Sequence, residues 1–353
     1  MNESKTDLLS LELHELEALM TELGEPKYRA KQLFTGMHKG ISPESLTNIS
    51  KATKAKLAEV SFYALPTVER KLVSALDGTV KYLFRLADGN CVESVIMRYE
   101  HGITICISSQ VGCRMGCRFC ASTIDGKVRD LAPAELLGQI LAATLDLGER
   151  ISNIVMMGIG EPLDNYENVI RFLHLVNHPE GLSIGYRHIS LSTCGVVPGI
   201  RRLAEEGLPV TLSVSLHAPT DEARSEIMPI NRAYPIRELM AACTDYFAAT
   251  GRRISFEYTL IAGKNDRPED AARLADLLRS TVGADGAPVH VNLIRANEVK
   301  ETGFKGTSSA SAAAFAERLN KRGLTATVRR RLGTDVNAAC GQLRRARKAS
   351  EEV

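Results

Sequence analysis

Three cysteines are spaced closely enough to bind one metal centre together. The stretch QVGCRMGCRFCAST, residues 110–123, places Cys113, Cys117 and Cys120 in a C-x3-C-x2-C pattern on a short glycine-containing loop. Three such thiolates can bind three irons of a 4Fe–4S cluster and leave the fourth iron open to a small molecule. Structural zinc favours four ligands in two separated pairs, and no Cys or His completes that pattern here. The spacing therefore favours an iron–sulfur cluster over zinc.

The other cysteines differ in what their surroundings indicate. Cys340 lies between small residues in DVNAACGQL, and the nearby arginines would favour its thiolate, the nucleophilic form. Its local sequence fits a reactive thiol and a buried thiol without a role equally well. Four further cysteines have surroundings that indicate packing alone: Cys91, Cys106, Cys194 and Cys243.

Alternating strands and helices follow the first part of the chain and would position these thiols. Strands are predicted at 104–109, 153–158, 188–193, 210–216, 255–261 and 290–294. Patterns of helical period lie between them, at 132–148, 165–177, 197–207, 234–251 and 268–280. Six such units predict an α/β protein with a parallel sheet and outer helices, either open or closed into a barrel.

Polar residues follow several of these strands at the end where ligands gather in such folds. The cysteine loop follows the first strand, and the later strands bring Gly160 and Glu161 in a GIGEP turn, Ser192, residues 215–217, and Asn292. Their convergence predicts a small-molecule pocket beside the cysteine loop. Taken singly, the GIGEP turn fits an ordinary helix-start loop equally well, and His217 fits a structural histidine.

Smaller segments flank this α/β core, which we expect to span residues 99–335. Residues 1–60 carry two amphipathic helical patterns that end at glycines, and they predict either a packing domain or a nucleic-acid-binding module. Residues 61–98 contain three short β runs and predict an antiparallel extension. Residues 336–353 would form a C-terminal segment that carries Cys340 and a basic tail.

Composition limits the class of protein. The 353 residues are 44% hydrophobic and 24% charged, with a net charge of +2, as in ordinary globular proteins. The N-terminus lacks the pattern of a signal peptide, and no apolar stretch has the length of a membrane span. Eight irregularly spaced cysteines favour metal or catalytic thiols in the cytoplasm over a disulfide framework. The arginine-rich runs 329–331 and 344–348 are either solvated surface or patches for nucleic-acid phosphates.

Seven motifs together resemble one family. They are VESVIMRY, CISSQVGCRMGCRFCAST, MMGIGEPLDN, SLSTCGVVPGI, SLHAPTDEARSEIMPIN, HVNLI and DVNAACGQL, and they extend over nearly the whole chain. The cysteine loop is similar to that of the radical S-adenosylmethionine (SAM) superfamily, and the full set is similar to the RlmN type of adenine-C2 methyltransferase. The resemblance implies a partial (β/α)6 TIM-like barrel.

The resemblance also implies cofactors and partners. It predicts one 4Fe–4S cluster per chain, bound by Cys113, Cys117 and Cys120, and two SAM molecules per turnover. The family's SAM contacts correspond to Gly160, Glu161, Ser192, Ser215, Leu216, His217 and Asn292. The substrates would be an adenosine in the peptidyl transferase centre of 23S rRNA and one in the tRNA anticodon loop. We expect a cytoplasmic monomer that has an electron donor and a thiol reductant as partners and no membrane partner.

Catalytic roles follow from the same resemblance. C2 of adenine is electrophilic, so a sulfonium cannot methylate it directly. In the family, one SAM methylates the cysteine that corresponds to Cys340, and a second yields a 5′-deoxyadenosyl radical that removes hydrogen from this methyl group. The resulting radical joins the protein to C2. Glu93 or a cysteine thiolate then takes the C2 proton. Cys106 attacks the methyl-carrying cysteine and forms a transient disulfide with it, which releases the product. Judged by its strand alone, Glu93 would be a surface carboxylate.

Two alternatives stay open, and one departure from the family pattern stands out. Cfr-type adenine-C8 methyltransferases share the cluster and both cysteines, although FCAST and STCGVVP are closer to the C2 group. A non-catalytic zinc or RNA-binding protein would purify without iron and sulfide. Ala132 replaces the hydroxyl residue expected before Pro133 at a helix start, which predicts the loss of about 1 kcal/mol of capping energy.

Overall fold

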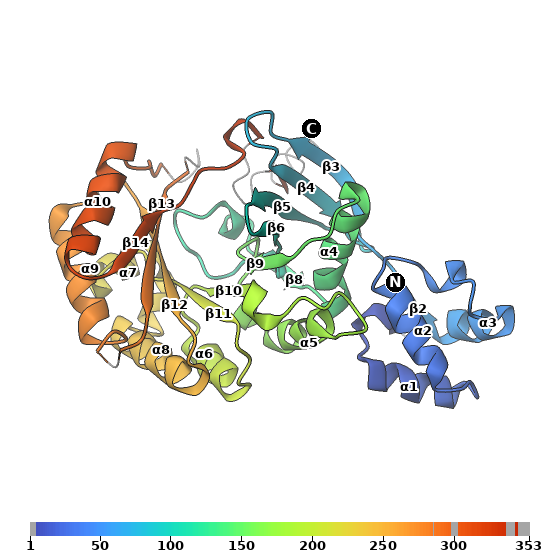
Figure 1. Cartoon of the computed structure of the whole chain (residues 1–353). Coiled ribbons are helices and arrows are strands. Elements are labelled where there is room, and N and C mark those ends of the chain that lie inside the picture. The colour runs from blue at the N-terminus through green and yellow to red at the C-terminus, as the bar shows by residue number, and fades with distance from the viewer. Residues whose placement is uncertain (1–4, 285, 298–302, 337–342, 345–353) are drawn as a thin grey trace.

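A sheet of ten strands forms the centre of the computed structural model, which describes residues 5–284, 286–297, 303–336 and 343–344 (Figure 1). Seven strands are parallel, in the order β14-β13-β12-β11-β10-β9-β6. They are β6 (Gly102–Cys106), β9 (Asn153–Met156), β10 (Ile189–Thr193), β11 (Thr211–Ser215), β12 (Ile254–Leu260), β13 (Val289–Arg295) and β14 (Thr325–Val328). The partial βα barrel expected from the sequence is therefore confirmed. β14 is a seventh parallel strand beyond the six predicted.

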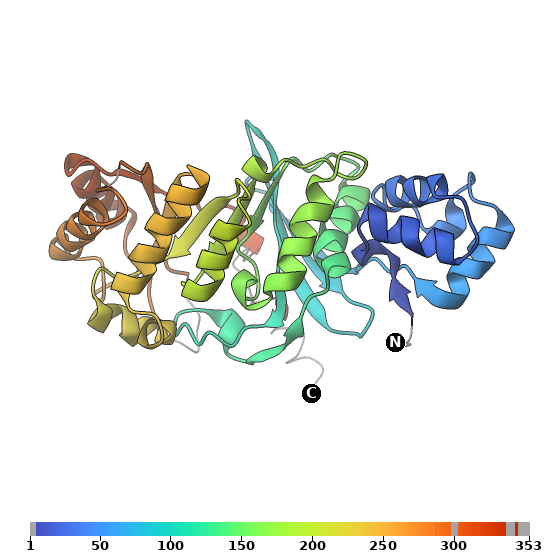
Figure 2. The same cartoon turned by 90° about the horizontal axis from the view of Figure 1, so that it is seen from below.

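Helices connect the parallel strands and lie in a row along the outer face of the sheet, as Figure 2 shows from below. They are α4 (Pro133–Leu147), α5 (Tyr166–Asn177), α6 (Val197–Glu205), α8 (Ile236–Thr250), α9 (Pro268–Ser280) and α10 (Ser309–Lys321). The short α7 (Asp221–Ile227) lies apart from this row, in the connection between β11 and α8. Within the described part of the chain, no helix is long and apolar enough to cross a membrane.

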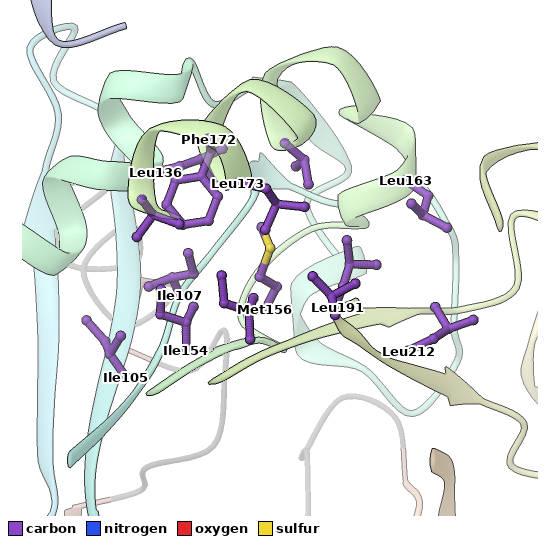
Figure 3. Close-up of a cluster of buried hydrophobic side chains, with 14 of the residues drawn as sticks. Ile105, Ile107, Leu136, Ile154, Met156, Leu163, Phe172, Leu173, Leu191 and Leu212 are labelled. Carbon is purple, nitrogen blue, oxygen red and sulfur yellow. The ribbon is translucent and has the colours of Figure 1, made fainter. Parts of the chain in front are cut away.

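The main core lies between the sheet and these outer helices. Figure 3 shows Leu136 of α4 and Phe172 of α5 facing Ile105, Ile154 and Met156 of the strands, and all five side chains are buried. Every residue of β12 is buried, as is typical of a parallel strand that is covered on both faces. Apolar residues on one face of each helix pack onto the sheet, and this burial is the main stabilising contribution to the barrel.

Three antiparallel strands extend the sheet beyond β6. They are β3 (Thr67–Val73), β4 (Val80–Arg85) and β5 (Cys91–Tyr99), and β5 pairs directly with β6. β3 forms the edge and is mostly exposed, whereas residues 91–97 of β5 are all buried. The extension therefore belongs to the same sheet as the barrel strands, and its inner strands are covered on both faces.

The N-terminal part of the chain packs beside α4 and α5 at one end of the molecule (Figure 1). It contains α1 (Leu13–Glu22), α2 (Tyr28–Met37) and α3 (Lys51–Val60), and the short strands β1 (Thr6–Asp7) and β2 (Ser61–Phe62) pair where it begins and ends. Its buried apolar side chains are continuous with the core of the barrel.

The missing hydroxyl at the start of α4 is replaced from outside the helix. Ser10 Oγ accepts a hydrogen bond from the Ala134 amide at 3.1 Å, as an N-cap side chain does for the second residue of a helix. Glu135 accepts a hydrogen bond from the Ala132 amide at 2.9 Å. The N-terminal part of the chain therefore provides the acceptor that Ala132 lacks, which would offset the capping loss expected for Ala132.

Candidate functional site

A small hairpin holds the cysteine loop at the carboxyl end of β6. β7 (Gln110–Gly112) pairs with β8 (Lys127–Asp130), and the loop lies between them. Gly112 has a φ of +81°, and a Cβ there would lie 1.9 Å from the Gly126 carbonyl oxygen, so only glycine fits. Lys127 Nζ also pairs with Asp164 at 2.9 Å and thus connects the hairpin to the turn after β9. Both ends of the loop are fixed.

The three predicted cluster cysteines line one cavity of about 230 Å³. Cys113 and Cys117 are buried and Cys120 is partly exposed. Burial, with a smaller contribution from Cys120, raises the pKa of Cys113 to about 12, and burial together with Cys120 and Cys113 raises the pKa of Cys117 well above its ordinary value. Buried thiols of this kind give up their protons when a metal centre binds, because the metal replaces the missing positive charge. The donor set fits an iron–sulfur cluster.

Among the described residues, no three His, Cys, Asp or Glu side chains converge closely enough to hold a single metal ion. The thiolates that hold an iron–sulfur cubane bind different iron atoms. They therefore line a shared cavity instead of meeting at one point. The arrangement of Cys113, Cys117 and Cys120 around the cavity matches this requirement.

Five of the seven predicted cofactor-binding residues line the same cavity: Gly160, Glu161, Ser192, Ser215 and His217. Leu216 is fully buried, and its carbonyl oxygen accepts a hydrogen bond from Arg224 at 3.1 Å. Asn292 does not line the cavity itself. Its side-chain amide donates a hydrogen bond at 2.8 Å to Glu257, which does line the cavity. The strand ends thus meet where the sequence predicted, with Leu216 and Asn292 outside the lining.

The GIGEP turn joins two other loops at the cavity. A Cβ on Gly158 would lie 2.5 Å from the Ile107 carbonyl oxygen, so the turn packs backbone to backbone against the end of β6. Glu161 accepts hydrogen bonds from the amides of Leu163 at 3.0 Å and Cys194 at 2.7 Å. Burial raises the pKa of Glu161, whereas these two amides favour its charged form. Glu161 therefore links the turn after β9 to the loop after β10.

His217 is held in a single orientation. Its φ of +58° lies in the left-handed region, which is strained for a histidine. Nδ1 accepts a hydrogen bond from the Thr259 amide at 2.9 Å, which leaves the proton on Nε2. Burial, and then the charge of Arg224, lower its pKa to about 3. His217 is therefore a neutral hydrogen-bond donor at the cavity.

The structure adds polar cavity residues that sequence reasoning missed. Glu257 and Arg329 line the cavity, and burial raises the pKa of Glu257 although Arg329 opposes it. Cys194 also borders the cavity, and its side chain is buried in an apolar cluster with Cys117, as expected for a packing residue. An acidic residue inside the apolar run ISFEYTL was the one available signal for Glu257.

Glu93 is not a surface carboxylate. It is 1% exposed and pairs with Lys81, also 1% exposed, at 3.0 Å. Val95 lies opposite Cys106 in the β5–β6 ladder, and residues two apart on a strand share a face. Glu93 and Cys106 therefore project from the same side of the sheet. Cys106 packs there with Met157, which lines the cavity.

Cys340 lies outside the described residues, but both flanks of its segment are anchored on the β extension. Asp335 accepts hydrogen bonds from Ser74 Oγ at 2.7 Å and the Ala75 amide at 2.9 Å, in the turn between β3 and β4. On the other flank, Leu343 packs against Leu83 and Cys91. The β extension thus holds the chain on either side of Cys340.

Two family models match this chain. The model described as "Radical SAM superfamily" matches residues 107–275, and the model described as "Ribosomal RNA large subunit methyltransferase N-terminal domain" matches residues 6–62. The first match covers the cysteine loop and the strands β9 to β12, and the second covers the N-terminal helices.

Similar proteins match over nearly the full length. The "probable dual-specificity RNA methyltransferase RlmN" of Alkaliphilus oremlandii is 52% identical over 342 residues, which cover 97% of this chain and 98% of that protein. The protein of the same name from Clostridium perfringens is 52% identical over 341 residues, 96% of each chain. The crystal structure of a radical SAM methyltransferase from Sphaerobacter thermophilus superposes with a TM-score of 0.89 at 42% identity, covering 96% of this chain and 98% of that one.

Proposed function

We propose, from the premise that the chain belongs to the RlmN family of radical SAM RNA methyltransferases, that it methylates C2 of an adenosine in 23S rRNA and of one in tRNA. Family membership establishes the class, a dual-specificity RNA methyltransferase that uses SAM and an iron–sulfur cluster. The Cfr alternative is not favoured, because the relatives that match over nearly the full length are RlmN proteins. The observation that carries the proposal is the single cavity lined by three cysteines and five strand-end residues.

The cavity residues would bind and orient the cofactors. Cys113, Cys117 and Cys120 would hold one 4Fe–4S cluster. Gly160, Glu161, Ser192, residues 215–217 and Asn292 would position SAM beside it, with His217 donating from Nε2. When bound, these cofactors supply the methyl group and the radical chemistry that an electrophilic ring carbon requires. Two SAM molecules are consumed per turnover, one for the methyl group and one for the radical.

Three residues would then act on the methyl group and the RNA. The Cys340 thiolate would accept the methyl group, and the radical chemistry that the bound cofactors supply would remove one hydrogen from it, so that its carbon bonds to C2 and joins Cys340 to the RNA. Glu93 would take the C2 proton, the surplus electron would return to the cofactors, and Cys106 would attack the Cys340 sulfur and break the sulfur–carbon bond. The released carbon would gain a proton to become the new methyl group, and the Cys106–Cys340 disulfide would be reduced by a cellular thiol. The shared strand face of Glu93 and Cys106, next to the cavity, supports this division of roles.

Variants of the two cysteines test this function. Cys340→Ala should prevent methyl loading and turnover, whereas Cys106→Ala should let a covalent protein–RNA adduct accumulate on a denaturing gel. Cys243→Ala is the matched control, since Cys243 is a fully buried core residue of α8. Mass spectrometry of digested rRNA and tRNA should show 2-methyladenosine. Finding 8-methyladenosine alone, or full turnover by Cys340→Ala, would contradict the proposal.

A further inference from the structure

Lys81 is a cation in an unusual place. Its side chain is 1% exposed and lies on β4, which has neighbours on both sides in the sheet. Lysine is almost never fully buried without a partner of opposite charge, because removing its ammonium from water is costly. Here Lys81 Nζ lies 3.0 Å from Glu93 Oε2. The lysine thus supplies the positive charge that a buried carboxylate needs.

The strand register directs Lys81 to the active-site side of the sheet. Lys81 lies opposite Val95, and Val95 lies opposite Cys106, so the three side chains share one face. Tyr82, the next residue of β4, points to the other face, where its hydroxyl donates to Asp146 of α4 at 2.6 Å. Lys81 is therefore on the side of Cys106 and the cavity, away from the outer helices.

The second carboxylate oxygen of Glu93 also has a partner. Oε1 accepts a hydrogen bond from the Arg344 amide at 2.7 Å, and Arg344 is 5% exposed. Arg344 follows Cys340 by four positions in the sequence (344 against 340). One buried carboxylate thus contacts Lys81 through one oxygen and the chain just after Cys340 through the other.

We propose that Lys81 is a positioning residue for RNA methylation, which holds the Glu93 carboxylate in place beside Arg344 so that Glu93 can take the C2 proton. This inference rests on the proposed function. Glu93 then has two tasks, to anchor the chain after Cys340 and to act as the base. Lys81 acts through Glu93 and does not itself touch the RNA.

Stability alone does not explain the pair. Replacing a buried ion pair by apolar groups of similar size is often neutral or stabilising, whereas removing one partner is strongly destabilising. A purely structural Lys81 would therefore be dispensable once Glu93 is neutralised as well. Both roles predict that losing both charges restores stability, and a positioning role adds that Lys81→Met alone slows the proton transfer while methyl loading is kept.

Four variants separate these roles: Lys81→Met, Lys81→Arg, Glu93→Gln, and the double variant Lys81→Met with Glu93→Gln. With the reconstituted enzyme and an rRNA fragment, methyl loading of Cys340 and decay of the covalent adduct are measured separately. Lys81→Met should keep methyl loading and slow adduct decay by about 100-fold, the usual contribution of a general base. Lys81→Arg should recover most of the rate, because it keeps the charge.

The double variant keeps the test decisive even where Lys81→Met folds poorly. Because Lys81 acts through Glu93, the covalent adduct of the double variant should decay no more slowly than that of Glu93→Gln alone. The melting temperature of the double variant should be higher than that of Lys81→Met. Lys71→Met is the matched control: Lys71 lies on the neighbouring strand β3, and its ion pair with Asp146 is about one-third exposed.

Three results would overturn the inference. One is adduct decay in Lys81→Met as fast as in the Lys71→Met control. Another is an equal loss of methyl loading and adduct decay, which indicates a structural role alone. The third is a double variant whose adduct decays clearly more slowly than that of Glu93→Gln alone, because Lys81 would then act independently of Glu93. Failure of the wild-type enzyme to form any 2-methyladenosine would instead overturn the proposed function, and this inference with it.

Discussion

Arg224 connects two of the loops that form the cavity wall. It is fully buried on α7, and its guanidinium donates to the carbonyl oxygens of Cys194 at 2.6 Å and Leu216 at 3.1 Å. It also donates to Asn231 at 2.9 Å. Burial lowers the pKa of Arg224, and nearby cysteines partly oppose this shift. Its planar fork reaches acceptors in several directions at once, which a lysine ammonium cannot do.

Substituting Arg224 by lysine should therefore loosen the cofactor site and lower stability. Each buried carbonyl left without its donor costs about 1–3 kcal/mol, so Arg224→Lys should lower the free energy of unfolding by about 3 kcal/mol. Urea denaturation measures this loss. Arg201→Lys, at a half-exposed position on α6, should change little. Equal stability of the two variants would contradict the role assigned to Arg224.

At the scale of elements, α4 shows how one segment completes another. Pro133 begins the helix, Gly148 ends it with a φ of +67°, and Ser10 supplies the acceptor that Ala132 lacks. The start of α4 therefore depends on the docked N-terminal segment. This dependence couples the N-terminal helices to the sheet that α4 covers.

The external cap predicts a specific rescue. Ser10→Ala should lower the free energy of unfolding by about 1 kcal/mol, the usual value of a capping hydroxyl. Adding Ala132→Ser should restore this loss, because it returns the acceptor to the N-cap position itself. Thermal denaturation of the single and double variants measures both effects. Ser45→Ala is the control, because it removes a surface hydroxyl that bonds to Ser42. If Ser10→Ala lowers the free energy of unfolding no more than Ser45→Ala does, the external cap is excluded.

At the scale of the whole molecule, His38 lies buried where the N-terminal helices meet the barrel. Its ring stacks on Phe34 at 4.0 Å, and a Cβ on Gly181 would lie 2.4 Å from its Nδ1. Burial, and then the charge of His178, lower its pKa from 6.5 to about 3. The native state therefore holds His38 neutral, while the unfolded chain would protonate it near pH 6.5.

Acid should weaken this junction. A histidine with a lowered native pKa contributes stability above pH 6.5 that is lost as the pH falls towards 3. The slope approaches about 1.4 kcal/mol per pH unit for one such group. His38→Leu should reduce the loss of stability between pH 6.5 and 5 without abolishing it, because the pKa of His217 is also lowered to about 3. Urea denaturation midpoints at several pH values measure this pH dependence of stability. His14→Gln, at an exposed position, is the control and should leave the slope of stability against pH unchanged.

The sequence by itself determined the cysteine loop, the six parallel strands and the edge at which polar residues meet. These features follow from spacing and periodicity, which are local: three thiols on a short loop, apolar runs of strand length, and glycines at turns. The family motifs determined the RNA methyltransferase class for the same reason, since each is a short stretch.

The tertiary structure alone decided which charges are buried. Glu93 and Lys81 lie in β runs whose periodicity shows only that they are strands. Their burial depends on what covers β4 and β5. On one face this is α4, and on the other it includes Leu343 and Arg344, more than 240 residues later in the chain. The same holds for Glu257 at the cavity, and for Ser10 as the cap of α4. Burial is a property of both faces of an element, and distant parts of the chain provide the second face.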